Sequence, residues 1–163
     1  MYIKECCFME LELFINEVNE WVDILDCDFE ELKEKLQKDT CYITDVDSDF
    51  NYSFEGAISL SELEDLADKI NELDNQCAED EFKALMEYLG NFEEAYSTWE
   101  AGKFSYYPDV KDREELGQYV VDEGLWGEIP ENLINYIDYE AIGRDIDLNA
   151  RGCFTENGFI ELY

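Results

Sequence analysis

Histidine is absent from this 163-residue sequence, and basic residues are scarce: 11 lysines and arginines stand against 43 aspartates and glutamates. Without an imidazole, the most common general base at neutral pH is missing, and a cysteine nucleophile lacks its usual activating partner. Carboxylates are so abundant that no pair of them identifies an acid–base site. A net charge of −32 also opposes binding to nucleic acid, whose phosphates are bound by Lys and Arg. We therefore expect a protein that is not an enzyme and does not bind nucleic acid.

Metal-site spacing is missing as well, because none of the six cysteines forms a C-x-x-C pair. The stretch DVDSDFNYSFEG, residues 45–56, does place acidic residues at alternating positions, as an EF-hand calcium loop does. Phe50 occupies the sixth position, where such a loop has Gly, and Gly56 occupies the twelfth, where it has Glu. A calcium site is the open alternative, but we expect no bound metal ion and no cofactor.

Long apolar runs are also missing. No stretch approaches the length of a membrane span, and no secretory signal pattern opens the chain. The six cysteines show no recognisable disulfide or zinc pattern, which indicates that their thiols are reduced. We therefore expect a cytoplasmic protein without membrane contact.

The composition is nevertheless that of a folded protein, since 46% of the residues are hydrophobic and 15% are aromatic. Changes in pattern along the chain predict an α+β fold of three small modules. Residues 1–57 form an α+β N-terminal module, residues 58–103 a helical central module, and residues 104–163 an α+β C-terminal module.

Apolar alternation predicts strands in the N-terminal module, at residues 1–8, 9–15, 19–25 and 41–46. A helix is predicted at residues 28–38, where Asp28 and Glu31 have the spacing of a capping box. Helical spacing in the rest of the chain predicts helices at residues 60–74, 78–89, 92–101 and 113–123, the first capped by Ser59 or Ser61. A short strand is predicted at residues 104–107, and a hairpin near the end turns at Asn157-Gly158.

The negative charge is spread along the chain rather than gathered in a tail. The net charge is −12 in residues 1–57, −11 in residues 58–102 and −10 in residues 104–163. In the helix after Ser59, acidic residues three and four apart face away from the leucine stripe and repel one another. An ordinary solvated helix face is the alternative explanation, but all three modules repeat the arrangement. We predict a presented acidic surface that includes Glu62, Asp65, Asp68, Glu72, Glu79, Asp80, Glu87, Glu93, Glu94, Asp109, Asp112, Glu114 and Glu115.

Duplex DNA carries one negative charge per about 1.7 Å of its axis. A dimer of this chain would carry twice −32, a charge equal to that of about 110 Å of duplex. A protein of this kind can compete with DNA for a basic groove. A salt-adapted or merely structural acidic protein is the alternative, although the high aromatic content fits salt adaptation poorly.

One apolar stretch stands out near the end of this acidic chain: EIPENLINYIDYEAIGRDI, residues 128–146. Its pattern resembles a motif of the ArdA family of antirestriction proteins, a Leu-Pro-Glu segment followed by Tyr-Phe-Asp-Tyr-Glu and Ala-Arg-Asp. The residues that fall on this motif are Pro130, Glu131, Tyr136, Asp138, Tyr139, Glu140, Arg144 and Asp145. FEEAYSTWEAGKFS, DFEELKEKL and YITDVDS also resemble family segments, so the resemblance covers residues 26–163, whereas the first 25 match poorly.

The resemblance implies an elongated mimic of duplex DNA that competitively occupies the DNA-binding channel of type I restriction–modification enzymes in the bacterial host. It also implies a homodimer joined through the C-terminal module. Core packing alone is the alternative role for the apolar stretch, with a helix that starts at Pro130. We assign the dimer and antirestriction motif to Trp126, Ile129, Pro130, Glu131, Leu133, Tyr136, Ile137, Asp138, Tyr139 and Glu140. An acidic inhibitor or adaptor of another DNA-binding protein or defence nuclease is the alternative function.

Overall fold

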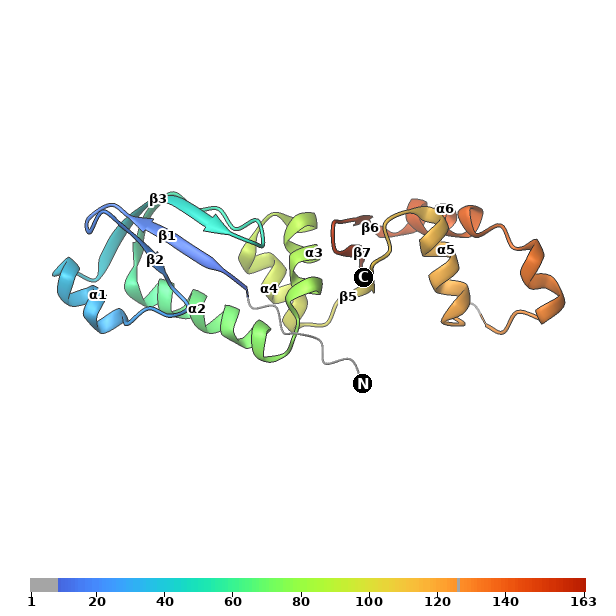
Figure 1. Cartoon of the computed structure of the whole chain (residues 1–163), viewed down its shortest axis with the longest axis horizontal. Coiled ribbons are helices and arrows are strands. Elements are labelled where there is room, and N and C mark those ends of the chain that lie inside the picture. Colours follow the sequence, from blue (N-terminus) through green and yellow to red (C-terminus); the bar gives the residue numbers. More distant parts are fainter. Residues whose placement is uncertain (1–8, 126) are drawn as a thin grey trace.

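The computed structural model describes residues 9–125 and 127–163, so the strand predicted at residues 1–8 and the motif residue Trp126 lie outside the described residues. The described residues form a mixed α+β structure with six α-helices, one 3-10 helix and two antiparallel sheets. The molecule is elongated, with the larger sheet near one end and the helices of the C-terminal region at the other (Figure 1). Within the described part of the chain, no helix is both long and apolar enough to cross a membrane.

The larger sheet has the strand order β2-β1-β3-β4 and lies beside two helices (Figure 1). Its elements are β1 (Leu11–Ile15), β2 (Glu20–Asp23), α1 (Phe29–Leu36), β3 (Thr40–Ser48), β4 (Gly56–Ser59) and α2 (Leu60–Asn75). The predicted alternation in β1 is confirmed, because Leu11, Leu13 and Ile15 are buried whereas Glu12 is exposed. The sequence did not predict β4, a four-residue strand that runs directly into α2.

Asp28 and Ser59 cap helices as predicted, but among the described residues only Ser59 forms the reciprocal capping box. The Asp28 carboxylate accepts the backbone N–H groups of Glu30 and Glu31 at 3.1 and 3.0 Å, and so begins α1. Of the two possible caps for α2, Ser59 is the one used, since it forms a reciprocal capping box with Glu62. These local bonds satisfy N–H groups that helix starts leave without intrahelical partners.

The middle of the molecule contains α3 (Glu79–Leu89) and α4 (Phe92–Glu100). Gly90 ends α3 in the left-handed conformation that is typical of a glycine at a helix C-terminus, with φ of 66°. Phe82 and Phe92 meet edge to face with ring centroids 5.4 Å apart, and Phe50 from the loop after β3 packs against both rings. One continuous hydrophobic core therefore extends from the larger sheet through α2, α3 and α4.

The C-terminal region combines a three-stranded sheet, β5-β7-β6, with two α-helices and a 3-10 helix. Its elements are β5 (Phe104–Pro108), α5 (Arg113–Asp122), η1 (Glu131–Tyr136), α6 (Tyr139–Asn149), β6 (Arg151–Phe154) and β7 (Gly158–Leu162). Neighbouring residues of β7 belong to different cores. Ile160 joins the large core, whereas Phe159 joins a smaller core with Val110, Leu116 and Val120. This follows from the alternation of side chains along a strand.

The predicted hairpin is present, but the predicted turn is displaced by one residue. Thr155 and Gly158 are joined by backbone hydrogen bonds, so Glu156 and Asn157 occupy the centre of the turn. The Thr155 hydroxyl accepts the N–H groups of Asn157 and Gly158 at 3.2 and 3.1 Å. A threonine that bonds its own turn therefore outweighs the Asn-Gly preference.

Helices α5 and α6 cross at two glycines. A Cβ atom added at Gly143 would lie 1.7 Å from the backbone oxygen of Arg113, and one added at Gly117 would lie 1.9 Å from that of Tyr139. The backbones can approach this closely because neither residue has a side chain.

Gly143→Ala is therefore expected to destabilise the protein, although alanine favours a helix over glycine by about 1 kcal/mol. The new methyl group would overlap backbone atoms, and relief of such overpacking costs about 1–3 kcal/mol. Because the overlap is with backbone, which cannot rotate away, we expect the upper part of this range and a net loss of about 1–2 kcal/mol in the free energy of unfolding, measured in urea. Leu148→Ala is the control, because Leu148 lies on the same helix but is exposed. An unchanged or raised stability of Gly143→Ala would contradict the close crossing.

Candidate interaction surfaces

The acidic side of α2 is exposed as predicted. Its leucine stripe is buried, and four carboxylates lie outward, a set that we call the α2 acidic face: Glu62, Asp65, Asp68 and Glu72. The backbone N–H and hydroxyl of Ser59 donate to Glu62 Oε2 at 2.9 and 2.6 Å, and these bonds hold the pKa of Glu62 below its usual value. Glu72 accepts a hydrogen bond from the Tyr96 hydroxyl at 2.7 Å. Hydrogen bonds thus hold Glu62 and Glu72 in place at the two ends of this face.

Lys69 connects the α2 acidic face to α4. Its ammonium lies 2.8 Å from Asp65 and 2.8 Å from Glu93, and 5.4 Å from the centre of the Tyr96 ring. Exposed ion pairs of this kind contribute little to stability. Their effect here is positional: one cation holds two exposed carboxylates side by side and leaves an excess of negative charge.

Acidic residues of α3 and α4 are placed less uniformly. Glu93 and Glu94 are exposed on α4, and Asp80 is partly buried on α3. Exposed Glu87 accepts the backbone N–H of Glu156 at 3.0 Å, a bond that joins α3 to the turn between β6 and β7.

The prediction of a surface position is wrong for Glu79. This residue is 5% exposed, and its Oε1 atom has no hydrogen-bond partner in the described structure. A helical pattern explains the burial, because Glu79 precedes the inward-facing Phe82 by three residues and Met86 by seven. The spacing alone would have predicted that Glu79 lies on the buried side of α3, but an acidic residue is normally expected at the surface.

The predicted acidic residues of the C-terminal region are exposed: Asp109, Asp112, Glu114 and Glu115. Two of them also begin α5. Asp112 accepts the backbone N–H of Glu115 at 2.9 Å, and the Glu115 carboxylate accepts the N–H of Lys111 at 2.7 Å. Their charges therefore complete a helix start as well as adding to the acidic surface.

The open face of the larger sheet carries carboxylates that were not predicted to belong to the acidic surface. Glu12 on β1 lies directly opposite Asp47 on β3, and both are exposed. Like charges at opposed positions destabilise a sheet, so stability alone does not favour this pair. The alternation of Glu12 with buried leucines was the signal that could have identified it.

The segment tested as a calcium loop adopts a different arrangement. Strand β3 runs through Asp45 and Asp47, and the Asp49 carboxylate pairs with Lys83 and accepts the backbone N–H of Glu10 at 2.9 Å. Phe50 is buried in the core. Across residues 9–125 and 127–163, no group of three or more cysteine or acidic side chains is placed to hold a metal ion.

The apolar stretch after Gly127 is not ordinary core. Leu133 and Ile134 are 48% and 44% exposed and Tyr136 is 82% exposed, and none of the residues of η1 is buried. The alternative of core packing alone is therefore wrong for these three side chains, which we call the η1 patch. Exposed apolar residues that cluster in this way typically mark a contact surface.

The helix expected to start at Pro130 is present as η1, which begins directly after Pro130. It is a 3-10 helix that ends at Tyr136, and a separate helix, α6, begins after Asp138. Asp138 accepts the backbone N–H of Ala141 at 3.0 Å and so caps α6. The remaining motif residues are divided: Ile129, Ile137 and Tyr139 are partly buried, whereas Pro130, Glu131, Asp138 and Glu140 are exposed.

Comparison with known proteins connects these surfaces to a family. The model of the family described as antirestriction protein (ArdA) matches residues 16–161. The match begins near the end of β1, ten residues earlier than the motifs indicated, and extends into β7. No curated protein matches the chain. Because the match spans almost the whole sequence, including both the α2 acidic face and the η1 patch, the chain belongs to the ArdA family of antirestriction proteins.

Proposed function

We propose that this antirestriction protein works as a homodimer that fills the DNA-binding channel of a type I restriction–modification enzyme, on the subunits that recognise sequence and methylate. Family membership makes the chain a non-enzymatic DNA mimic directed against type I systems. Its carboxylates take the positions of phosphates and face lysines and arginines of the channel. Since no base is read, enzymes with different target sequences can be blocked by the same surface.

The observation that carries this proposal is the spread of outward carboxylates along an elongated body. They lie on the open sheet face, on α2 and α4, and at the start of α5, and so follow the long axis of the molecule (Figure 1). Because every region has a similar net charge, the array is not confined to one end. Such a distribution is suited to a long, positively charged groove.

The proposed dimer contact is the η1 patch. This patch lies at the end of the molecule opposite the larger sheet (Figure 1). If two chains paired there, the larger sheet of each chain would lie at an outer end of the dimer. A twofold contact uses the same surface on both chains, and the three exposed apolar side chains of η1 could meet their copies in this way. The exposed Glu131, Asp138 and Glu140 would then continue the negative charge across the joint.

We also propose the three-module division at residues 1–57, 58–103 and 104–163. The separate small core around Leu116 supports the second boundary. At the first boundary, strand β4 and α2 follow each other without a break and contribute to one core. There the division describes secondary structure rather than separate packing. For the cell, we propose the bacterial cytoplasm, where the target enzyme acts on DNA.

The direct test is competition for the enzyme. A labelled duplex that contains the recognition site of a purified type I enzyme is titrated with this protein, and bound DNA is measured. We expect displacement of the duplex, with an inhibitory concentration that rises in proportion to the DNA concentration. Inhibition that is independent of DNA concentration would contradict occupation of the channel.

Single carboxylate changes are expected to have small effects. Asp68→Asn removes one exposed charge that has no hydrogen-bonding or ion-pair partner among the described residues. Because the charge is distributed, we expect the inhibitory concentration to rise less than about threefold, the scale of a single exposed charge interaction. A loss of inhibition from this one change would indicate a local hot spot instead of an array.

A further inference from the structure

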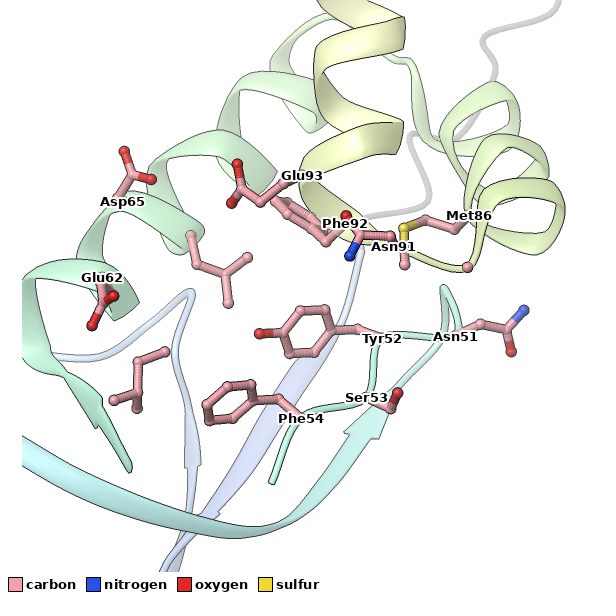
Figure 2. Close-up of a pocket in the computed structure, with 13 residues that line it drawn as sticks. Asn51, Tyr52, Ser53, Phe54, Glu62, Asp65, Met86, Asn91, Phe92 and Glu93 are labelled. Carbon is pink, nitrogen blue, oxygen red and sulfur yellow. The ribbon is translucent and has the colours of Figure 1, made fainter. Parts of the chain in front are cut away.

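A pocket of about 300 Å³ opens beside the α2 acidic face (Figure 2). It lies between α2, the first residues of α4 and the loop that joins β3 to β4. Two of its lining residues, Glu62 and Asp65, belong to the α2 acidic face. A partner that contacts this face therefore also reaches the mouth of the pocket.

Three aromatic side chains line the pocket: Tyr52, Phe54 and Phe92. Tyr52 and Phe92 meet edge to face at 5.8 Å, which fixes the Tyr52 ring. Figure 2 shows Tyr52 and Phe54 extending from their loop toward α2, with the Tyr52 hydroxyl directed into the open space. Burial, and next the charge of Glu93, raises the pKa of Tyr52, so its hydroxyl is neutral at physiological pH and can accept an N–H group.

Three carboxylates, those of Glu62, Asp65 and Glu93, lie around the same space, and Lys69 neutralises part of their charge. Glu62 uses Oε2 for Ser59, and its Oε1 atom accepts no hydrogen bond within the described residues. Lys69 already pairs with Asp65 and Glu93, so Glu62 is the pocket carboxylate that has no cation partner among the described residues.

We propose that this pocket receives an arginine side chain of the restriction enzyme's DNA-binding channel. The inference rests on the proposed function and adds a specific anchor to it. A planar guanidinium stacks on aromatic rings and binds carboxylates through a fixed fork of donors, which matches rings on one side and Glu62 on the other. A DNA phosphate presents charge without such aromatic walls. The pocket thus supplies affinity that duplex DNA does not, and a competitor of DNA needs such an advantage.

The first experiment measures the binding of an arginine derivative to the pocket in the absence of any enzyme. The full ¹⁵N-labelled protein is titrated with N-acetyl-arginine methylamide, and N-acetyl-citrulline methylamide serves as the neutral isostere. We expect saturable amide shifts confined to residues around Tyr52, Glu62 and Phe92 with the arginine probe, and none with citrulline. N-acetyl-lysine methylamide is expected to bind more weakly. Equal shifts with both isosteres, or shifts spread over the whole acidic surface, would overturn the proposal.

The second experiment tests use of the pocket against a type I enzyme. Tyr52→Leu and Phe54→Leu each remove an aromatic wall and leave the net charge at −32, whereas Tyr42→Leu removes an exposed ring on the larger sheet. We expect about a tenfold rise in inhibitory concentration for each pocket variant and no change for Tyr42→Leu. Two pocket variants guard against a folding defect in one, which amide spectra would reveal.

The outcomes separate the two proposals. If the unaltered protein fails to displace DNA, the proposed function fails. If it displaces DNA while folded Tyr52→Leu and Phe54→Leu act like the unaltered protein, only the arginine pocket is refuted.

Discussion

Replacing the four carboxylates of the α2 acidic face together by Gln and Asn is expected to raise the inhibitory concentration about 100-fold at low salt. The change lowers the net charge from −32 to −28 per chain, and all of it falls on one exposed strip. Glutamine at position 62 can still accept from Ser59, so the start of α2 is preserved. The measurement is inhibition of a type I enzyme at several salt concentrations. The difference from the unaltered protein is expected to shrink as salt rises, because ions screen exposed charges.

The matched control neutralises four carboxylates on and just after α1: Glu30, Glu31, Glu34 and Asp39. Its net charge is the same, but its position is the outer end of the larger sheet (Figure 1). We expect a smaller loss than for the α2 variant. If both variants lose inhibition equally, net charge rather than the α2 acidic face is responsible. Unchanged inhibition and unchanged salt sensitivity in both would contradict DNA mimicry.

Tyr136→Asp is expected to convert the proposed dimer to a monomer. Tyr136 is the most exposed side chain of the η1 patch, and a twofold contact would bury it twice, once from each chain. A buried carboxylate without a partner is costly, so two of them would separate the chains at micromolar concentration. Light scattering should show half the mass of the unaltered protein. The inhibitory concentration should rise, since the continuous array becomes half as long.

Tyr42→Asp is the matched control for this change. Tyr42 is an exposed tyrosine on β3, at the opposite end of the molecule from η1 (Figure 1). Its substitution adds the same charge and removes the same ring, and we expect the dimer to persist. A Tyr136→Asp protein that stays dimeric and inhibits fully would show that the η1 patch is not the joint.

Much of the fold could be predicted because its signals are local. Asp28 and Ser59 begin helices through bonds to residues two or three positions away, and Gly90 ends one through its own backbone freedom. The burial of Leu11 and Leu13 follows from alternation within one strand. Each of these features requires only neighbours in the sequence, so a single sequence contains the information.

The errors concern contacts between distant segments or between competing local bonds. Glu79 is acidic and near a helix start, and both facts favour exposure, but the rotation that buries Phe82 buries it too. The turn near Asn157 depended on which of two local preferences was stronger, and the Thr155 hydroxyl decided it. The η1 residues have apolar side chains, yet nothing in their own sequence shows whether the rest of the chain covers them.

Strand β7 makes the two cores depend on each other. Ile160 and Phe159 are adjacent in the chain, yet they contribute to different cores, so neither core is complete without the same strand. Melting β7 would expose both at once, which predicts one cooperative thermal transition instead of two separate ones. For the same reason, a fragment that ends at Lys103 would lack the residue that closes the large core beside α3. Strand β7 therefore fixes the angle between the two ends of the molecule. A change in that angle would disturb the packing of Ile160 in the large core and of Phe159 in the small one.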